Sequence, residues 1–212
     1  MNTELASDKK LLRIFSKLYP NPSSELNFSN PYELVVSVIL SAQCTDKKVN
    51  EITPRLFKKY SSFAALAKAK LPDLEKLLRS INYYRTKSKN LLALSRIMTE
   101  ELGGKLPTTT LALQDLPGIG PKTAAVIQCE LKVEPALPVD THVFRVARRL
   151  GLATGSTPLK VQAQLMERFK PKHWRNLHHF LILHGRRVCK APRPKCGECA
   201  LAKLCPAAEG TK

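Results

Sequence analysis

Hydrophobic residues recur at helical spacing along almost the whole chain. In the segment KKLLRIFSKLY, residues 9–19, apolar side chains lie three and four positions apart, as on one face of a helix. No segment shows sustained apolar–polar alternation of period two, so no strand is expected. The sequence therefore predicts an all-α fold of about ten short helices. The further expected helices lie near 29–40, 45–60, 62–69, 72–81, 84–102, 108–116, 122–131, 141–151, 157–169 and 172–186.

Several helix ends carry recognisable signals. Asn30 can cap the helix that follows it, Pro31 suits a first helical position, and Glu33 completes a capping-box pattern. The pair Gly103-Gly104 is typical of a helix C-terminus. Prolines near 20–23 and 135–138 flank a central block, which is consistent with two lobes.

Charge is the strongest global signal. The 212 residues include 35 Lys and Arg against 17 acidic residues, a formal net charge of +18. Such an excess favours a polyanionic partner, above all nucleic acid, over a basic surface that only water covers. The sequence contains no run of eighteen apolar residues, so no membrane span is expected. The charged N-terminal segment lacks a signal-peptide pattern, so we expect an intracellular, cytoplasmic protein.

The stretch LPGIGPKTAAVI, residues 116–127, predicts a tight turn between two helices. Gly118 and Gly120 can both take positive φ, and they leave backbone N–H groups bare at a helix start. Such groups can cradle a DNA phosphate, with Ile119 as an apolar knob on the turn. The alternative is an ordinary connection between core helices, and the basic charge of the chain favours phosphate binding.

Lys122 lies in the first turn of the helix after these glycines. Most lysines at such a place are surface charges. The positive end of the helix dipole, together with partial burial, would favour a neutral amine. A neutral amine can attack a sugar C1′ and form a Schiff base. Lys122 is therefore a candidate nucleophile.

Asp140, in PVDTHVFRV, directly precedes another helical pattern. Its ordinary role is an N-cap, yet a carboxylate near a sugar can also stabilise positive charge at C1′. His142 and Arg145 follow on the same helix and could face DNA phosphates. A purely structural role is equally open for both residues.

Four cysteines lie within 17 residues in CKAPRPKCGECALAKLC, namely Cys189, Cys196, Cys199 and Cys205, with gaps of six, two and five residues. A disulfide set is disfavoured in an intracellular nucleic-acid-binding chain. Zinc and a [4Fe–4S] cluster remain. The spacing favours the iron–sulfur cluster, because zinc ribbons usually carry two Cys-x-x-Cys pairs and this segment has one.

These motifs occur in the order seen in the endonuclease III family of DNA glycosylases, and the chain resembles that family over essentially its whole length. LPGIGPKTA matches the helix-hairpin-helix motif, and residues 25–46 resemble the family's early helix and loop. The resemblance implies a two-lobed helix-hairpin-helix glycosylase fold with DNA bound in the cleft. A six-helix barrel domain would span 24–134, with the hairpin near 109–127. Residues 1–23 and 135–212 would form the iron–sulfur cluster domain.

The resemblance also implies roles for individual residues. Lys122 matches the Schiff-base nucleophile, Asp140 the catalytic carboxylate, and the four cysteines the cluster ligands. Gln43 matches the residue that fills the gap left by an everted base. In the loop INYYRTKSKN, Asn82 and Tyr83 replace the family's usual Gly-Leu pattern, and Tyr83 can still act as a wedge.

The expected function is that of a bifunctional DNA glycosylase and AP lyase. Its partner would be double-stranded DNA with damaged pyrimidines or abasic sites, bound by a monomer at the nucleoid of a prokaryotic cell. Two alternatives stay open at this point. One is a monofunctional mismatch glycosylase, and the other is a non-catalytic helix-hairpin-helix protein that only binds DNA.

Overall fold

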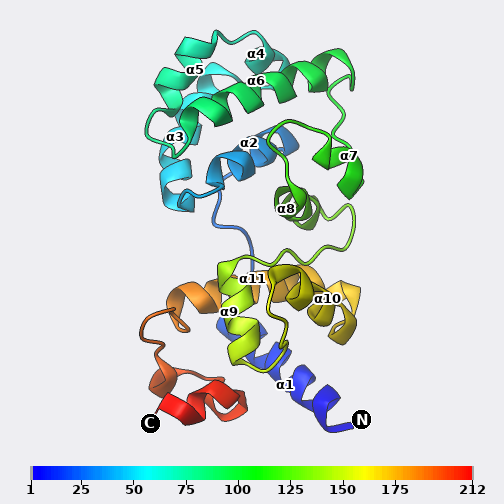
Figure 1. The fold of residues 1–212 in the computed structure, drawn as a ribbon, viewed down its shortest axis with the longest axis vertical. Coiled ribbons are helices and arrows are strands. Elements are labelled where there is room, and N and C mark those ends of the chain that lie inside the picture. Colours follow the sequence, from blue (N-terminus) through cyan, green and yellow to red (C-terminus); the bar gives the residue numbers. More distant parts are fainter. Residues whose placement is uncertain (1, 212) are drawn as a thin grey trace. The chain divides into compact units, whose positions relative to one another are not determined.

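The computed structural model describes residues 2–211, with side chains from 7 to 208. Over that range the chain forms eleven α-helices and three short 3₁₀ segments, with no strand (Figure 1). The predicted all-α fold is confirmed. The chain divides into two compact units, which are described separately: unit 1 combines residues up to Ser23 with residues from Pro135 on, and unit 2 is Ser24–Glu134.

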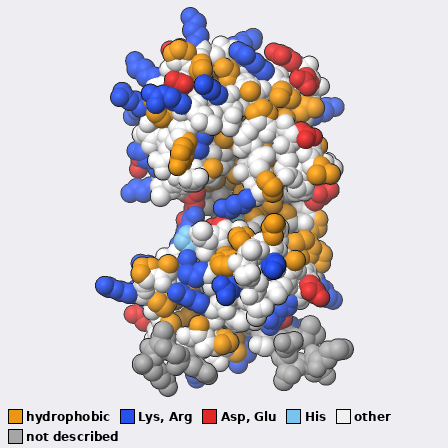
Figure 2. Space-filling view, in the orientation of Figure 1, with side chains coloured by type: hydrophobic (Ala, Val, Ile, Leu, Met, Phe, Trp, Pro, Cys, Tyr) orange, Lys and Arg blue, Asp and Glu red, His pale blue; other side chains and the backbone are white. Residues whose placement is uncertain are grey.

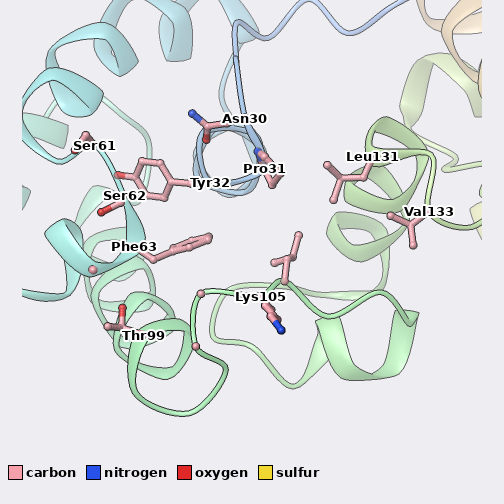
Figure 3. Close-up of a pocket in the computed structure, with 14 residues that line it drawn as sticks. Asn30, Pro31, Tyr32, Ser61, Ser62, Phe63, Thr99, Lys105, Leu131 and Val133 are labelled. Atoms are coloured by element: carbon pink, nitrogen blue, oxygen red, sulfur yellow. The ribbon is translucent and has the colours of Figure 1, made fainter.

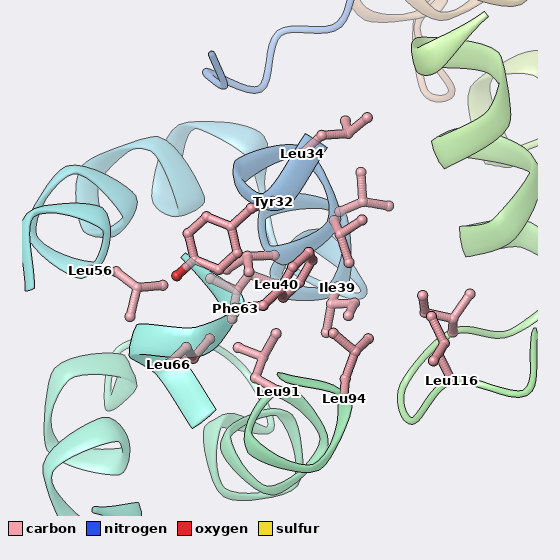
Figure 4. Close-up of a cluster of buried hydrophobic side chains, with 14 of the residues drawn as sticks. Tyr32, Leu34, Ile39, Leu40, Leu56, Phe63, Leu66, Leu91, Leu94 and Leu116 are labelled. Carbon is pink, nitrogen blue, oxygen red and sulfur yellow. The ribbon is translucent and has the colours of Figure 1, made fainter. Parts of the chain in front are cut away.

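Unit 2 is built around a helix that is buried on almost every side. This helix, α2, places eight of its side chains in the core, including Leu34 and Leu40, which are fully buried. Because its apolar residues leave no polar face, other helices must cover it all round, and α3, α6 and α8 pack against it. Figure 4 shows Leu34 and Leu40 among the buried side chains of this core. The helices of unit 2 are α2 (Pro31–Ser41), α3 (Asp46–Lys59), α4 (Phe63–Ala67), α5 (Leu71–Leu78), α6 (Tyr84–Glu100), α7 (Thr110–Gln114) and α8 (Pro121–Leu131).

Unit 1 joins the N-terminal helix to the C-terminal part of the chain. The rings of Phe15 in α1 and Phe180 in α11 stack with centroids 5.3 Å apart in its core. The ion pair between the buried Asp8 and Arg168, with Oδ1 and Nη2 2.8 Å apart, also ties α1 to α10. Segments more than 150 residues apart therefore form one core. The elements of unit 1 are α1 (Asn2–Leu18), α9 (Thr141–Arg149), α10 (Pro158–Arg168), α11 (Pro171–Arg187), η1 (Cys196–Glu198), η2 (Ala202–Leu204) and η3 (Pro206–Thr211).

The predicted helix ends at α2 and α6 are observed. The Asn30 side chain accepts from the Glu33 N–H at 3.0 Å, and the Glu33 carboxylate accepts from the Ser29 N–H at 2.7 Å. Gly103 and Gly104 follow α6 with φ of 55° and 79°, a conformation that favours glycine.

None of the described helices is both long and apolar enough to cross a lipid bilayer. Lys and Arg side chains are instead spread over the surfaces of both units (Figure 2).

Candidate active site and cysteine cluster

The predicted hairpin at 109–127 consists of α7, a turn, and α8. Gln128, buried in α8, holds the two helices together through its side-chain amide. It accepts from the Thr110 hydroxyl at 2.8 Å and donates to the Thr108 carbonyl at 2.9 Å. The turn thus lies between helices whose spacing is fixed by a buried polar side chain.

Only one of the two glycines in the turn has positive φ. Gly118 has φ of 84°, whereas Gly120 has φ of −88°, an ordinary value for any residue. The expectation of positive φ at both glycines was therefore wrong for Gly120. A Cβ at Gly118 would lie 3.1 Å from the Cβ of Asn90, whereas a Cβ at Gly120 would meet no heavy atom within 4 Å. Gly118 serves the fold, and Gly120 leaves open space beside its backbone.

Ile119 lies in the hydrophobic core of unit 2 and is 4% exposed. Its N–H donates to the Leu116 carbonyl at 3.1 Å. Neither its side chain nor its N–H is free for DNA, so the expectation that Ile119 contacts DNA is corrected: it anchors the turn from inside.

The start of α8 is open to an anion. Gly120 is the N-cap and offers no side-chain hydrogen bond to the first turn, and Pro121 follows it. The backbone N–H groups of the first turn therefore remain available to an acceptor. Lys122, the second residue of α8, is exposed, so the partial burial expected from its sequence position is absent.

Substitutions at the two glycines are expected to affect different properties, namely folding stability at Gly118 and DNA binding at Gly120. Gly118→Ala should lower the free energy of unfolding by about 1–2 kcal/mol, because alanine is strained at positive φ and meets Asn90. Gly120→Ala should change it by less than about 0.5 kcal/mol and instead weaken DNA binding, since its methyl group occupies the space beside the open amides. Urea unfolding and DNA titration of both variants check this, and equal losses of stability would contradict it.

Gln43 and the Asn82–Tyr83 turn lie together in unit 2. Asn82 Nδ2 donates to the Gln43 carbonyl at 2.6 Å, and both residues line one hollow with Thr45 and Lys48. Gln43 is exposed, and Tyr83 is 64% exposed despite its size. A large exposed aromatic side chain beside an exposed amide is suited to contact with stacked bases.

Lys87 was not identified from the sequence, although it organises this region. It is 6% exposed, and its Nζ donates to the carbonyls of Leu40 and Ala42 at 2.7 and 2.6 Å. Burial lowers the pKa of Lys87. The two carbonyls at the end of α2 hold its ammonium group and thereby fix the segment that leads to Gln43. A lysine in a helical pattern reads as a surface charge, so no local signal could reveal this role.

Asp140 is the N-cap of α9 and is half-buried. Its Oδ1 accepts from the Val143 N–H at 2.7 Å. This bond holds one of the two carboxylate oxygens in place. Asp140 belongs to unit 1 and Lys122 to unit 2.

Arg145 makes hydrogen bonds inside unit 1. Its guanidinium donates to the carbonyls of Gly185 and Cys189, each at 3.0 Å. Burial is the main cause that lowers the pKa of its neighbour His142, so this ring is neutral at pH 7. Arg145 therefore braces α9 against the end of α11, and the expected phosphate contacts of the half-buried Arg145 and His142 stay a prediction.

The four cysteines of the C-terminal segment line one small cavity. Its other walls are mostly apolar, with His184 the buried polar member. Arg149, which the sequence did not single out, secures the segment by donating to the carbonyls of Lys190 and Ala191 at 2.8 and 3.0 Å. None of these four cysteines forms a disulfide.

His184 connects this cavity to α1. Its Nδ1 lies 3.2 Å from the Tyr19 hydroxyl, and its Nε2 lies 3.5 Å from the Cys199 Sγ. Burial lowers the pKa of His184 to about 4, so the ring is neutral at pH 7. If Tyr19 donates to Nδ1, the remaining N–H of the ring points at the sulfur.

Because the folded protein buries His184 in its neutral form, we expect the protein to lose stability in acid. The unfolded histidine titrates near pH 6.5, so below that pH the unfolded chain takes up a proton that the folded chain refuses. The free energy of unfolding should fall by about 2 kcal/mol between pH 7.5 and 5 through His184 alone. Urea unfolding of His184→Gln at both pH values should lack this loss, whereas His173→Gln, at a less buried site, should behave like the original protein.

Unit 2 has a further hollow near the ends of α2, α6 and α8, with Tyr32, Phe63 and Leu131 among its walls (Figure 3). Lys105 is the charged residue of its lining, and the predicted site residues are all elsewhere. This hollow does not bear on the chemistry of the hairpin.

The chain is similar to known DNA repair proteins along its length. A sequence model of the HhH-GPD superfamily base excision DNA repair proteins matches residues 36–171. Endonuclease III of Synechocystis sp. is 39% identical over 98% of this chain and 97% of its own length. The chain belongs to the endonuclease III family. Endonuclease III of Bacillus subtilis is 43% identical, over 89% of this chain and 86% of that protein.

The fold agrees with this endonuclease III membership. The solved structure of a trapped endonuclease III–DNA covalent intermediate has a TM-score of 0.90 and 38% identity, and covers 100% of this chain and 99% of that one. The helix-hairpin-helix glycosylase fold expected from the sequence is confirmed.

Proposed function

We propose that the protein is a bifunctional DNA glycosylase and AP lyase of base excision repair. It removes oxidised pyrimidines and cleaves on the 3′ side of the abasic site through a Schiff base on Lys122. The observation that supports this most is the exposed Lys122 amine at the uncapped start of α8. A DNA phosphate bound at the start of α8 would bring the neighbouring sugar within reach of Lys122.

Binding of DNA in this proposal depends mainly on phosphate contacts. Lys and Arg side chains supply sequence-independent attraction, and the open amides after Gly120 receive a phosphate. A damaged base stacks poorly and leaves the duplex at reduced cost. Gln43 then fills the vacancy and Tyr83 contacts the strand opposite.

The chemistry begins when the nitrogen lone pair of the Lys122 amine attacks C1′ of the everted nucleotide. The C1′–N bond breaks and the base leaves with its electron pair, while Asp140 stabilises the positive charge on the sugar. Opening of the sugar ring gives an iminium ion that acidifies the C2′ proton. Loss of this proton drives β-elimination of the 3′ phosphate, which breaks the strand.

The cysteine cavity fits a [4Fe–4S] cluster better than a single ion. Four thiolates around one zinc at about 2.3 Å would have sulfur atoms only about 3.8 Å apart. Within the described residues, no three Cys, His, Asp or Glu side chains converge closely enough to hold one ion. Burial, and then the neighbouring cysteines, raise the pKa of Cys199 and Cys205, so thiolates here need a cationic centre. A bound cluster would hold the basic loop in shape and take no part in base removal.

In this proposal unit 2 is the barrel domain with the hairpin, and unit 1 is the cluster domain. The protein acts as a monomer on duplex DNA that carries damaged pyrimidines or abasic sites. Because that DNA is the chromosome, the protein works in the bacterial cytoplasm at the nucleoid.

Asp140 offers a way to separate capping from catalysis. Asp140→Asn should keep the N-cap, since Asn caps as well as Asp, and should slow base release by about a hundredfold or more because the charge is lost. Asp140→Ala should slow it equally and also lower the free energy of unfolding by about 1 kcal/mol. Single-turnover kinetics and urea unfolding check this. Full activity of the Asn variant would reduce Asp140 to a cap.

The function is tested with duplexes that carry thymine glycol, other oxidised pyrimidines, uracil or an abasic site. Base release and strand cleavage are measured separately on the same reactions. We expect both on oxidised pyrimidines and cleavage alone on the abasic duplex. Base release without cleavage would identify a monofunctional glycosylase, and equal binding of all duplexes without either product would identify a binding protein.

A further inference from the structure

Two turns of unit 2 hold exposed, non-glycine residues in the left-handed region. Gln43 has φ of 55° and Tyr83 has φ of 57°. This conformation is unfavourable for residues with a Cβ, and it persists where surrounding contacts fix it. Both side chains are exposed, so packing of these side chains in the core does not supply that restraint.

Polar contacts to the backbone supply it instead at Gln43. Lys87 Nζ holds the carbonyls of Leu40 and Ala42, the last of which directly precedes Gln43. Asn82 Nδ2 holds the carbonyl of Gln43 itself, at 2.6 Å. The strained residue is therefore fixed from both sides by side chains that come from outside its own turn.

We propose that Asn82 is a positioning residue, which fixes the backbone of Gln43 and joins its turn to that of Tyr83 as one rigid DNA-contacting unit. Asn82 directly precedes Tyr83, so its bond to the Gln43 carbonyl links the two turns with one side chain. The inference rests on the proposed function, in which Gln43 fills the vacancy and Tyr83 contacts the strand. It adds a residue that acts through the backbone of Gln43 and makes no contact with DNA itself.

The place of Asn82 favours this geometric role over a stabilising one. Asn82 is exposed, and an exposed hydrogen bond competes with water and adds little to folding. Its loss should therefore leave the fold intact and free Gln43 to leave the left-handed conformation. Lys87 differs because it is buried, and its removal would leave two carbonyls without their donor.

The first measurement is single-turnover base release from a duplex with an oxidised pyrimidine. Asn82→Ala should slow it about fivefold, the factor expected for loss of one ordered hydrogen bond. Binding to undamaged duplex and the melting temperature should stay as in the original protein. Asn82→Gln, which retains an amide donor, should recover most of the rate, and Thr86→Ala, an exposed α6 residue nearby, should have no effect.

A double-mutant cycle with Gln43→Ala separates positioning from direct DNA contact. If Asn82 acts through Gln43, Asn82→Ala should cause no further loss in the Gln43→Ala background. Multiplying losses would show that Asn82 contacts DNA itself and would overturn the inference. An unchanged rate in the Asn82→Ala single variant would overturn it as well.

Hydrogen exchange in the free protein tests the same link without DNA. The amides of residues 42–45 should exchange faster in Asn82→Ala, with exchange elsewhere unchanged. No change at these amides would overturn the inference while leaving the proposed enzyme intact. If the unsubstituted protein releases no base, the proposed function is overturned. Hydrogen exchange would still show in that case whether Asn82 fixes the backbone of Gln43.

Discussion

Lys122→Ala is expected to abolish the covalent adduct that borohydride traps between the protein and abasic DNA. Base release and strand cleavage should fall at least about a thousandfold, because the amine that attacks C1′ is gone. The fold should be unaffected, since Lys122 is exposed and lies outside the cores of the two units. The free energy of unfolding of the Lys122→Ala variant should differ from that of the unsubstituted protein by less than about 0.5 kcal/mol. Denaturing gels of borohydride-treated mixtures measure the adduct.

Lys76→Ala is the matched control for this experiment. Lys76 is also an exposed helical lysine of unit 2, in α5, so its removal changes the net charge equally. It should leave adduct yield and cleavage unchanged, with a slight loss of DNA affinity at low salt at most. A Lys122→Ala protein that still forms the adduct at full yield would show that another amine is the nucleophile.

Cys199→Ser is expected to remove the metal centre and to unfold the C-terminal segment. The purified original protein should be brown with broad visible absorbance, and the variant should be colourless. The free energy of unfolding should fall by at least about 4 kcal/mol, because loss of a bound metal group belongs to the most damaging class of substitutions. DNA affinity should fall too, since Lys190, Arg193, Lys195 and Lys203 lie in this segment. Iron and sulfide analysis, absorbance and urea unfolding measure these effects.

Cys44→Ser provides the control, because Cys44 is a free cysteine of unit 2 outside the cavity. It should keep the colour, the iron content and nearly all of the stability. A colourless original protein with one zinc per chain would contradict the iron–sulfur proposal while leaving the DNA chemistry at Lys122 untouched.

Two residues of the predicted site have partners inside the protein that the sequence did not indicate. Ile119 and Arg145 stand in segments that look like DNA-binding sequence, yet Ile119 enters the core and Arg145 donates to backbone carbonyls of α11 and Cys189. An apolar side chain on a turn is as well stabilised by a core as by a ligand, and a guanidinium binds carbonyls as well as phosphates. Residue type therefore leaves the partner undetermined. Lys87 was missed for the same reason, because its partners are carbonyls more than forty residues away.

The sequence by itself determined the helices, their caps, the hairpin and the grouping of the cysteines. These features depend on neighbours a few residues apart: the spacing of apolar side chains, the reach of Asn30 to the Glu33 amide, and four thiols within 17 residues. Tertiary structure alone decided which glycine takes positive φ, which cations are bound internally, and that Asn82 meets Gln43. Those outcomes depend on contacts between segments distant in the chain, whose positions are fixed only when the cores pack.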